Sequence, residues 1–311
     1  MNHLAVLTTG RQDWGILRST VMRLRQDQEF RLTIIAGGMA CDERFGNLAV
    51  KLETEALAPL VRVPWEIRLE NGANKSREAA AALAEIAEAL RQLRPEAFIL
   101  VGDRSETLAA AMAAVMNAVP VIHLHGGEET EGALDNYYRH AISKLSRVHF
   151  VSHSQHRERL LRMGENPNLV FTVGAPGIDN LHRPDLPPAD QVLKDLGLSK
   201  TENLPLLLVT YHPPTQNGDS KREIDGLLTA LGRITAVSIL TLPNDDPGNA
   251  PVRQAMAKFA AAEPSQRVVV SALGEDRYWA LLKRVDAVLG NSSSGLIEAP
   301  AIPVPVLNLG R

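Results

Sequence analysis

Three features are missing from this 311-residue chain, and each absence excludes a class of protein. Cys41 is the only cysteine, which excludes an intramolecular disulfide framework and a zinc site built from cysteines. No window approaches 18 uninterrupted apolar residues, so we expect no membrane-spanning helix. Lys and Arg number 33 against 36 Asp and Glu, so no basic excess exists for coating a nucleic acid.

The first ten residues also lack the pattern of a secretory signal. They form a short apolar run that ends in turn residues, without the basic start and longer apolar segment of such signals. We therefore expect a soluble, cytoplasmic α/β protein with no nucleic-acid or membrane partner. The length suits roughly two domains.

Short apolar runs rich in β-branched residues alternate with longer segments of helical period. Several runs are continuously apolar, as expected for strands of a parallel sheet with helices on both faces. The expected strands are 4–8, 31–36, 97–101, 119–124, 148–151 and 170–173, then 206–210, 237–242, 267–271, 287–289 and 304–309. The expected helices include 76–93, 107–116, 155–163 and 276–284. This alternation occurs twice and predicts two Rossmann-like, doubly wound α/β domains.

A charged, proline-rich segment at 180–191 separates the two series. It predicts domains at 1–180 and 181–311, with a ligand cleft between them at the carboxyl ends of the strands. The chain stops at Arg311, directly after the last expected strand and without a helix to cover it. We therefore expect a further natural segment after Arg311.

Polar residues gather where the expected strands end. Arg11 follows Gly10 in a turn into a helix, where backbone amides and the guanidinium suit a phosphate; an ordinary strand–helix turn is the alternative. Gly10 alone does not make a dinucleotide fingerprint. Asp103 follows strand 97–101 as a carboxylate facing the cleft or as the N-cap of the next helix.

The segment from His123 to His140 holds the densest group of titratable residues. Strand alternation puts His123 and His125 on the same side, and Glu128 and Asp135 follow closely. This pattern suits a metal site, acid–base chemistry or a solvated loop. The glycine pair after His125 indicates close backbone approach to a ligand, so we favour acid–base chemistry.

Three strand ends of the second series carry polar groups. His212 precedes a proline and is held in an extended conformation. Segment 290–298 places serine hydroxyls and free amides at a helix start, where they suit a diphosphate, and Glu298 suits a ribose diol. A serine-rich helix cap is the alternative. The candidate residues in this half are His212, Asn244, Ser292, Ser293, Ser294, Gly295 and Glu298.

Six motifs occur together in the order and spacing of one family. They are Gly10-Arg11-Gln12-Asp13, Gly102-Asp103-Arg104, His123-x-His125-Gly-Gly-Glu128, Arg139-His140-Ala141-Ile142-Ser143-Lys144, His212-Pro213 and Gly290-Asn-Ser-Ser-Ser-Gly295. By these motifs the chain resembles, from about residue 3 to its end, the hydrolysing UDP-N-acetylglucosamine 2-epimerases of sialic and legionaminic acid biosynthesis.

The resemblance implies a glycosyltransferase-B fold with a nucleotide sugar in the cleft, and it implies neither NAD nor a required metal. The implied reaction is an anti elimination of UDP across C1–C2 that gives 2-acetamidoglucal. Water then adds at C1 and a proton adds to the opposite face of C2, which releases an N-acetylmannosamine-type sugar and UDP. Family members are often homodimers or homotetramers, and they continue beyond the position of Arg311.

The resemblance also assigns roles. Asp103 and Asp135 match the catalytic carboxylates, and His212 matches a histidine near the diphosphate. Some members have a glutamate in place of His125, so the division of acid–base work between His125 and Glu128 stays open. The expected contacts to UDP are Arg11, Arg104, His212, Asn244, Ser292, Ser293, Ser294, Gly295 and Glu298.

Three other functions stay open. The first is a hydrolysing epimerase of UDP-N,N′-diacetylbacillosamine, whose sugar has an acetamido group at C4 and no oxygen at C6. The second is a non-hydrolysing epimerase that retains UDP and adds it back. The third is a nucleotide-sugar-binding relative without catalysis. A glycosyltransferase of the same fold would need an acceptor site, for which the sequence gives no signal.

Overall fold

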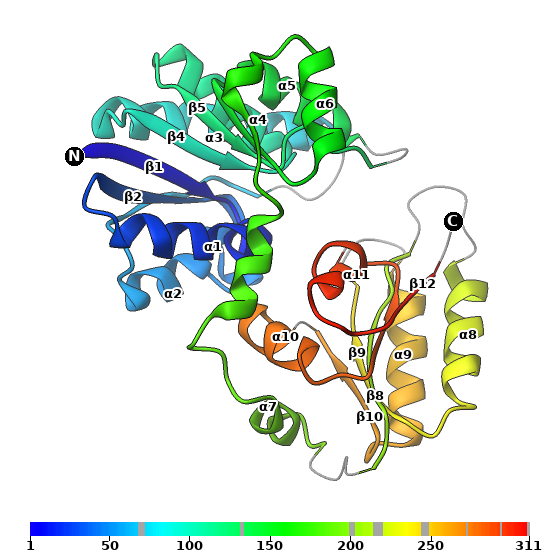
Figure 1. Ribbon diagram of the computed structural model, residues 1–311. Coiled ribbons are helices and arrows are strands. Elements are labelled where there is room, and N and C mark those ends of the chain that lie inside the picture. The colour runs from blue at the N-terminus through cyan, green and yellow to red at the C-terminus, as the bar shows by residue number, and fades with distance from the viewer. Residues whose placement is uncertain are drawn as a thin grey trace. The chain divides into compact units, whose positions relative to one another are not determined.

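The computed structural model describes residues 1–67, 72–130, 134–198, 203–213, 220–243, 249–271, 273–292 and 294–309. The chain divides into two compact units, Met1–Asn180 (unit 1) and Leu181–Arg311 (unit 2). Figure 1 shows unit 1 from blue to green and unit 2 from green to red. Each unit contains one parallel sheet flanked by helices.

Unit 1 has a seven-stranded sheet among its described residues, in the order β3-β2-β1-β4-β5-β6-β7, with every pairing parallel. Its elements are β1 Asn2–Thr8, α1 Arg11–Gln26, β2 Phe30–Gly37, α2 Leu48–Glu55, β3 Leu60–Val63, α3 Gly72–Leu93, β4 Ala97–Val101, α4 Ser105–Met116, β5 Val121–Leu124, α5 Asp135–Leu145, β6 Val148–Val151, α6 Ser154–Arg162 and β7 Val170–Thr172. Short 3₁₀ helices occupy Gly38–Cys41, Glu43–Phe45, Pro167–Leu169 and Pro176–His182.

Helices cover both faces of this sheet because its strands are apolar on both sides. On one face, Phe98 and Leu100 of β4 pack with Ile86 of α3 and with side chains of α4 and α5. On the other face, Val6 of β1 packs with Leu17 of α1 and with side chains of α2. The buried α1 residues Trp14, Leu17 and Val21 recur at the spacing of one helical face.

Unit 2 has a five-stranded parallel sheet among its described residues, in the order β10-β9-β8-β11-β12. Its elements are α7 Ala189–Asp195, β8 Leu206–Thr210, α8 Ser220–Leu231, β9 Val237–Thr241, α9 Ala250–Ala262, β10 Arg267–Val270, α10 Glu275–Leu282, β11 Ala287–Gly290, α11 Ser294–Ile297, the 3₁₀ helix Ala299–Ala301 and β12 Val306–Asn308. One apolar cluster joins the sheet to α7 and α10, and another joins it to α8 and α9.

The predicted fold class, two parallel and doubly wound sheets, is confirmed. Most expected strands agree with the structure to within a residue or two at each end. Strand 119–124 begins later, at Val121, because Pro120 has no N–H group to pair. Strand β3 was not predicted from the sequence. Across the described ranges, no helix combines the length and apolar character needed to cross a membrane.

Candidate active site

Each sheet has one point at which the order of its strands reverses. This switch point lies between β1 and β4 in unit 1 and between β8 and β11 in unit 2. The loops after the two flanking strands run to opposite faces, which leaves room for a ligand at the carboxyl ends. Arg11 and Asp103 follow β1 and β4, and His212 and Ser292 follow β8 and β11. The topology therefore puts these predicted site residues where such sheets bind ligands.

Asp103 lies at the switch point of unit 1 and pairs with a buried cation. Its Oδ2 accepts a hydrogen bond from Nη2 of Arg139 on α5. Burial raises the pKa of the Asp103 carboxyl, the charge of Arg139 opposes that rise, and the charges of Asp135 and Glu128 add to it. The N-cap position of α4 belongs to Arg104, so Asp103 is not the cap. A carboxyl of raised pKa holds a proton closer to neutral pH, as general acid–base catalysis needs.

His125 follows β5 directly and has a strained backbone. Its φ of 62° lies in the left-handed region that residues other than glycine seldom adopt. Nδ1 lies 2.7 Å from Oε1 of Glu128, whereas Nε2 is buried and has no hydrogen-bond partner. Burial opposes ionisation of Glu128, but hydrogen bonds from His125 and Ser152 outweigh it and lower the pKa of Glu128 to about 2. Such strain and an orphaned polar atom are typical of functional sites.

Two residues from the β6–α6 junction extend this pair. Ser152 donates a hydrogen bond to Oε1 of Glu128 at 2.5 Å, and its Oγ lies 2.9 Å from Nδ1 of His156. Our sequence reasoning missed both residues. The available signal was the position of Ser152 directly after an apolar strand, as for the other site residues.

His123 is completely buried and has a structural role. Its Nε2 donates to the carbonyl of Gly102 at 2.8 Å, and its Nδ1 lies 3.1 Å from Oγ of Ser143. Burial lowers the pKa of His123 to about 3, so the ring is neutral. Within the described residues, no three His, Cys, Asp or Glu side chains cluster as a metal site requires.

The glycine pair packs against protein rather than leaving space for a ligand. A Cβ on Gly126 would lie 2.9 Å from the His123 ring and 3.0 Å from Oγ of Ser143. A Cβ on Gly127 would lie 2.5 Å from the carbonyl oxygen of His156. We expected the glycine pair to approach a ligand closely. In the structure the two glycines instead allow the loop to pack against α5 and α6.

The two arginines predicted to contact UDP, Arg11 and Arg104, have different neighbours. Arg11 begins α1, and its guanidinium covers Gly46, where a Cβ would collide with it. Nε of Arg104 donates to Oε1 of Glu106 at 2.6 Å. Burial opposes the charge of Arg104, but Glu106 and Asp13 outweigh that effect and raise its pKa. Much of the charge on Arg104 is therefore already compensated within unit 1.

In unit 2, the switch point brings two strand ends into close contact. Gly290 ends β11 with a φ of 141°, and a Cβ there would overlap the backbone of Thr210. Asn291 hydrogen-bonds through its side chain to both the N–H and the C=O of His212, each at 2.7 Å. Burial lowers the pKa of the His212 ring.

A pocket opens at the carboxyl ends of β8 and β11. Its polar lining includes Ser292 and Ser294, and the hydroxyl of Tyr278 hydrogen-bonds to Ser294. Burial raises the pKa of Glu298, although hydrogen bonds from Ser294 and Tyr278 oppose the rise. Gly295 also lines the pocket, so three of the predicted residues converge here, and Glu298 is joined to them through Ser294 and Tyr278. The predicted contacts Asn244 and Ser293 lie outside the described residues.

Sequence comparison relates the chain to epimerases of nucleotide sugars. The family model described as UDP-N-acetylglucosamine 2-epimerase matches residues 22–311. A Legionella pneumophila UDP-N,N′-diacetylbacillosamine 2-epimerase (hydrolyzing) is 33% identical over 98% of this chain and 80% of the relative. A Campylobacter jejuni GDP/UDP-N,N′-diacetylbacillosamine 2-epimerase (hydrolyzing) is 30% identical over 99% and 80%. The Escherichia coli polysialic acid biosynthesis protein P7 is 31% identical over 100% and 79%.

Solved structures show the same fold. A Neisseria meningitidis UDP-GlcNAc 2-epimerase bound to UDP-GlcNAc matches with a TM-score of 0.80 and 18% identity, over 99% of this chain and 82% of that chain. A Staphylococcus aureus MnaA bound to UDP also matches with a TM-score of 0.80, at 17% identity, over 100% and 80%.

Proposed function

Since the chain belongs to the hydrolysing branch of the UDP-N-acetylglucosamine 2-epimerase family, we propose that it releases UDP from a UDP-2-acetamido sugar and inverts C2. Elimination across C1–C2 gives a 2-acetamidoglucal. Water then adds at C1, and a proton adds to the opposite face of C2. The observation that carries this proposal is the pairing of Asp103 with Arg139, beside Asp135 and the His125–Glu128 pair.

Unit 1 supplies the proton chemistry in this proposal. Removal of a carbon-bound proton needs a positioned base, and its return to the other face needs an acid. Asp103 and Asp135 are the proposed catalytic carboxylates, and His125 and Glu128 share the remaining acid–base work. The raised pKa of Asp103 supports its place in this set.

Unit 2 supplies most of the proposed nucleotide contacts. Ser292, Ser294 and Gly295 line the pocket that would take the diphosphate, and a leaving diphosphate needs such polar stabilisation. Glu298 would accept hydrogen bonds from the ribose, and His212 would lie near the diphosphate. The proposed set is completed by Ser293, Asn244, Arg11 and Arg104, the last through guanidinium nitrogens that Glu106 does not hold.

The relatives favour UDP-N,N′-diacetylbacillosamine as the substrate over UDP-N-acetylglucosamine, the substrate preferred from the sequence. Two relatives at 33% and 30% identity are named for the bacillosamine sugar. The description of the family model favours UDP-N-acetylglucosamine as the second candidate. Both sugars carry the 2-acetamido group and the C2–H bond that the proposed reaction uses.

An assay in deuterated water with each UDP-sugar tests the proposal. We expect free UDP and a manno-configured sugar with deuterium at C2, formed faster from the diacetylbacillosamine substrate. Retention of UDP in the product would indicate a non-hydrolysing epimerase. Tight UDP binding without product from either sugar would indicate a binding protein.

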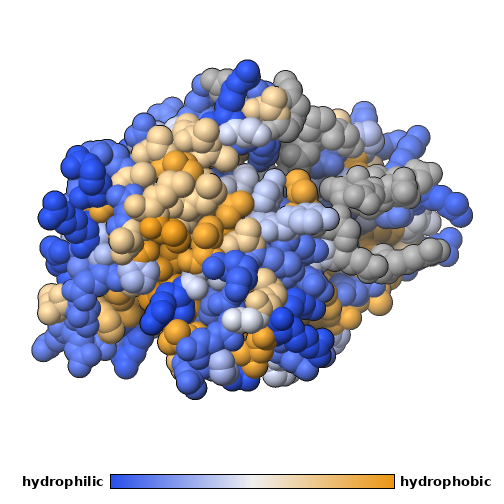
Figure 2. Space-filling model, turned by 90° about the horizontal axis from the view of Figure 1, so that it is seen from above, coloured by the Kyte–Doolittle hydropathy of each residue, from blue (hydrophilic) through white to orange (hydrophobic). Residues whose placement is uncertain are grey.

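We also propose that the chain forms a homodimer or homotetramer. Helix α4 exposes Met112, Val115 and Met116, and an apolar area is visible on the surface in Figure 2. Exposed apolar patches of this kind often mark protein contacts. Light scattering coupled to gel filtration measures the mass, and a monomer at micromolar concentration would contradict this proposal.

A further inference from the structure

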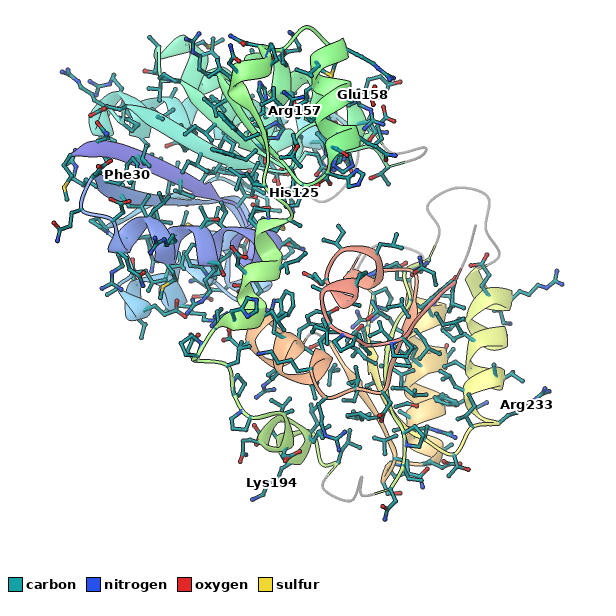
Figure 3. The ribbon with its side chains drawn as sticks, viewed as in Figure 1. Phe30, His125, Arg157, Glu158, Lys194 and Arg233 are labelled. Carbon is teal, nitrogen blue, oxygen red and sulfur yellow. The ribbon has the colours of Figure 1, made fainter. Side chains whose placement is uncertain are left out.

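We propose that Glu128, Ser152 and His156 are positioning residues that fix His125 as the tautomer with hydrogen on Nδ1, so that His125 presents a bare Nε2 as the base. This inference rests on the proposed function, and it settles the division of work between His125 and Glu128. Nε2 of His125 is buried in this structure and must be uncovered to contact the sugar, whereas Glu128 acts through His125. Figure 3 labels His125, the end of this hydrogen-bonded chain.

The directions of the hydrogen bonds follow from the charge of Glu128. A carboxylate can only accept hydrogen bonds. Because hydrogen bonds lower the pKa of Glu128 to about 2 in spite of its burial, it is ionised at neutral pH. Nδ1 of His125 and Oγ of Ser152, at 2.7 and 2.5 Å from Oε1, must therefore both donate.

The same logic fixes His156. Ser152 has one hydroxyl hydrogen, and Glu128 takes it. The 2.9 Å contact between Oγ of Ser152 and Nδ1 of His156 therefore has Ser152 as the acceptor and His156 as the donor. His156 thus orients Ser152, Ser152 orients Glu128, and Glu128 orients the ring of His125.

The other ring nitrogen of His125 supports the same tautomer. Nε2 is buried and has no hydrogen-bond partner in the described structure. A hydrogen there would be a buried donor without an acceptor, which is unfavourable. The tautomer that places hydrogen on Nδ1 avoids this cost and leaves a lone pair on Nε2.

The backbone holds the chain of contacts in place. The N–H of His125 donates to the carbonyl of Phe150 at 3.1 Å, which fixes the loop to the end of β6. Gly127 packs against the carbonyl of His156, and Arg159 of α6 donates to the carbonyl of Gly127. The loop that carries Glu128 is therefore bound to the helix that carries His156.

In the proposed reaction, Nε2 of His125 takes the proton from C2 of the sugar. The C2–H electron pair forms the C1=C2 double bond as the bond from C1 to the UDP oxygen breaks. The resulting imidazolium carries hydrogen on both nitrogens and lies beside the carboxylate of Glu128. That carboxylate stabilises the positive charge without taking the proton, as in other carboxylate–histidine pairs.

Nitrogen-15 NMR of the histidine rings tests the tautomer without any substrate. We expect hydrogen on Nδ1 of His125 in the wild type. Glu128→Gln should move it to Nε2, because the glutamine amide can donate to Nδ1. A wild-type ring with hydrogen on Nε2 would overturn the inference.

Kinetics test the consequence. Glu128→Gln should lower kcat roughly 10³-fold with little change in KM, since a wrong tautomer removes the base. Ser152→Ala and His156→Ala should each lower kcat roughly tenfold. His156→Asn should keep most of the kcat that His156→Ala loses, because the asparagine amide can replace the Nδ1 donor.

Matched substitutions on α6 control for general damage. Glu158→Gln and Ser154→Ala change exposed side chains, and Figure 3 shows Glu158 away from His125. Both variants should keep the wild-type kcat and the wild-type tautomer. Circular dichroism checks that each variant is folded.

The two proposals can fail separately. If the wild type turns over neither UDP-sugar, the proposed function fails, and the tautomer measurement still decides the geometry. If the wild type is active while Glu128→Gln and Ser152→Ala keep its kcat, only the positioning role is overturned.

Discussion

The side-chain amide of Asn291 satisfies both backbone polar groups of His212. Oδ1 of Asn291 accepts from the N–H at 2.7 Å, and Nδ2 donates to the C=O at 2.7 Å. These contacts join the ends of β8 and β11, the two strands that flank the switch point of unit 2. Pro213 restricts His212 to an extended conformation, in which its backbone has no helical partner. Asn291 therefore sets the position of His212.

Asn291→Ala should destabilise unit 2 and weaken UDP binding. It leaves an N–H and a C=O of His212 without partners, which costs about 1–3 kcal/mol of unfolding free energy. Urea denaturation and UDP titration measure the two effects. Asn291→Asp retains the acceptor and loses the donor, so it should fall between alanine and the wild type. Equal stability and affinity of the alanine variant would show that these contacts do not matter.

Asp103→Asn should lower turnover by roughly 10²–10⁴-fold, the range expected for loss of a general acid–base group. UDP affinity should stay within about twofold, because none of the proposed UDP contacts changes. Steady-state kinetics and UDP titration separate the two quantities. Asp195→Asn, an exposed substitution on α7, should leave both unchanged. Wild-type turnover in the Asp103 variant would remove this carboxyl from the mechanism.

Asp135→Asn should lower turnover and also shift the pH profile of the remaining activity. The negative charge of Asp135 helps raise the pKa of Asp103, after burial and against Arg139. Removal of that charge should therefore move the ionisation of Asp103 to lower pH. The pH dependence of kcat/KM reports this shift. A profile that moves to higher pH would contradict the coupling.

Ser292→Ala and Ser294→Ala should each weaken UDP binding, by roughly 5- to 15-fold for loss of one hydrogen bond of about 1–1.5 kcal/mol. Both side chains line the pocket at the end of β11. Calorimetric titration measures the dissociation constants. Ser265→Ala, an exposed substitution between α9 and β10, is a matched control outside that pocket. An unchanged affinity in both pocket variants would count against the diphosphate assignment.

The strand ends could be predicted from the sequence because apolar runs end there in glycine, aspartate or histidine. Parallel pairing then gathers their carboxyl ends on one edge, so the positions of Asp103, His125 and His212 followed from local pattern alone. Strand β3 escaped prediction because it has only four residues and exposes Arg62. As an edge strand, it depends on pairing with β2 more than on its own pattern.

The partners of the site residues could not be predicted in the same way. Arg139 reaches Asp103 across 36 positions, and Ser152 reaches Glu128 across 24. Such contacts arise only when neighbouring strands and helices pack together, and spacing in the sequence does not reveal them. The same limit applies to Gly126 and Gly127. The sequence indicates that something packs closely against these glycines, but it does not show whether that is protein or ligand.

The buried ring of His123 should make unit 1 sensitive to acid. Burial lowers the pKa of His123 to about 3 from 6.5, so between these values the unfolded chain binds the extra proton. The free energy of unfolding should therefore fall as pH falls through this window, by about 1.4 kcal/mol per pH unit, with no contribution above pH 6.5.

His123→Gln retains a donor for Gly102 and cannot titrate. Its stability should thus fall less steeply with acid, whatever its stability at neutral pH. Urea denaturation from pH 4.5 to 7 measures both slopes, and His182→Gln, an exposed substitution, should follow the wild type. Equal slopes for His123→Gln and the wild type would contradict a buried, neutral His123.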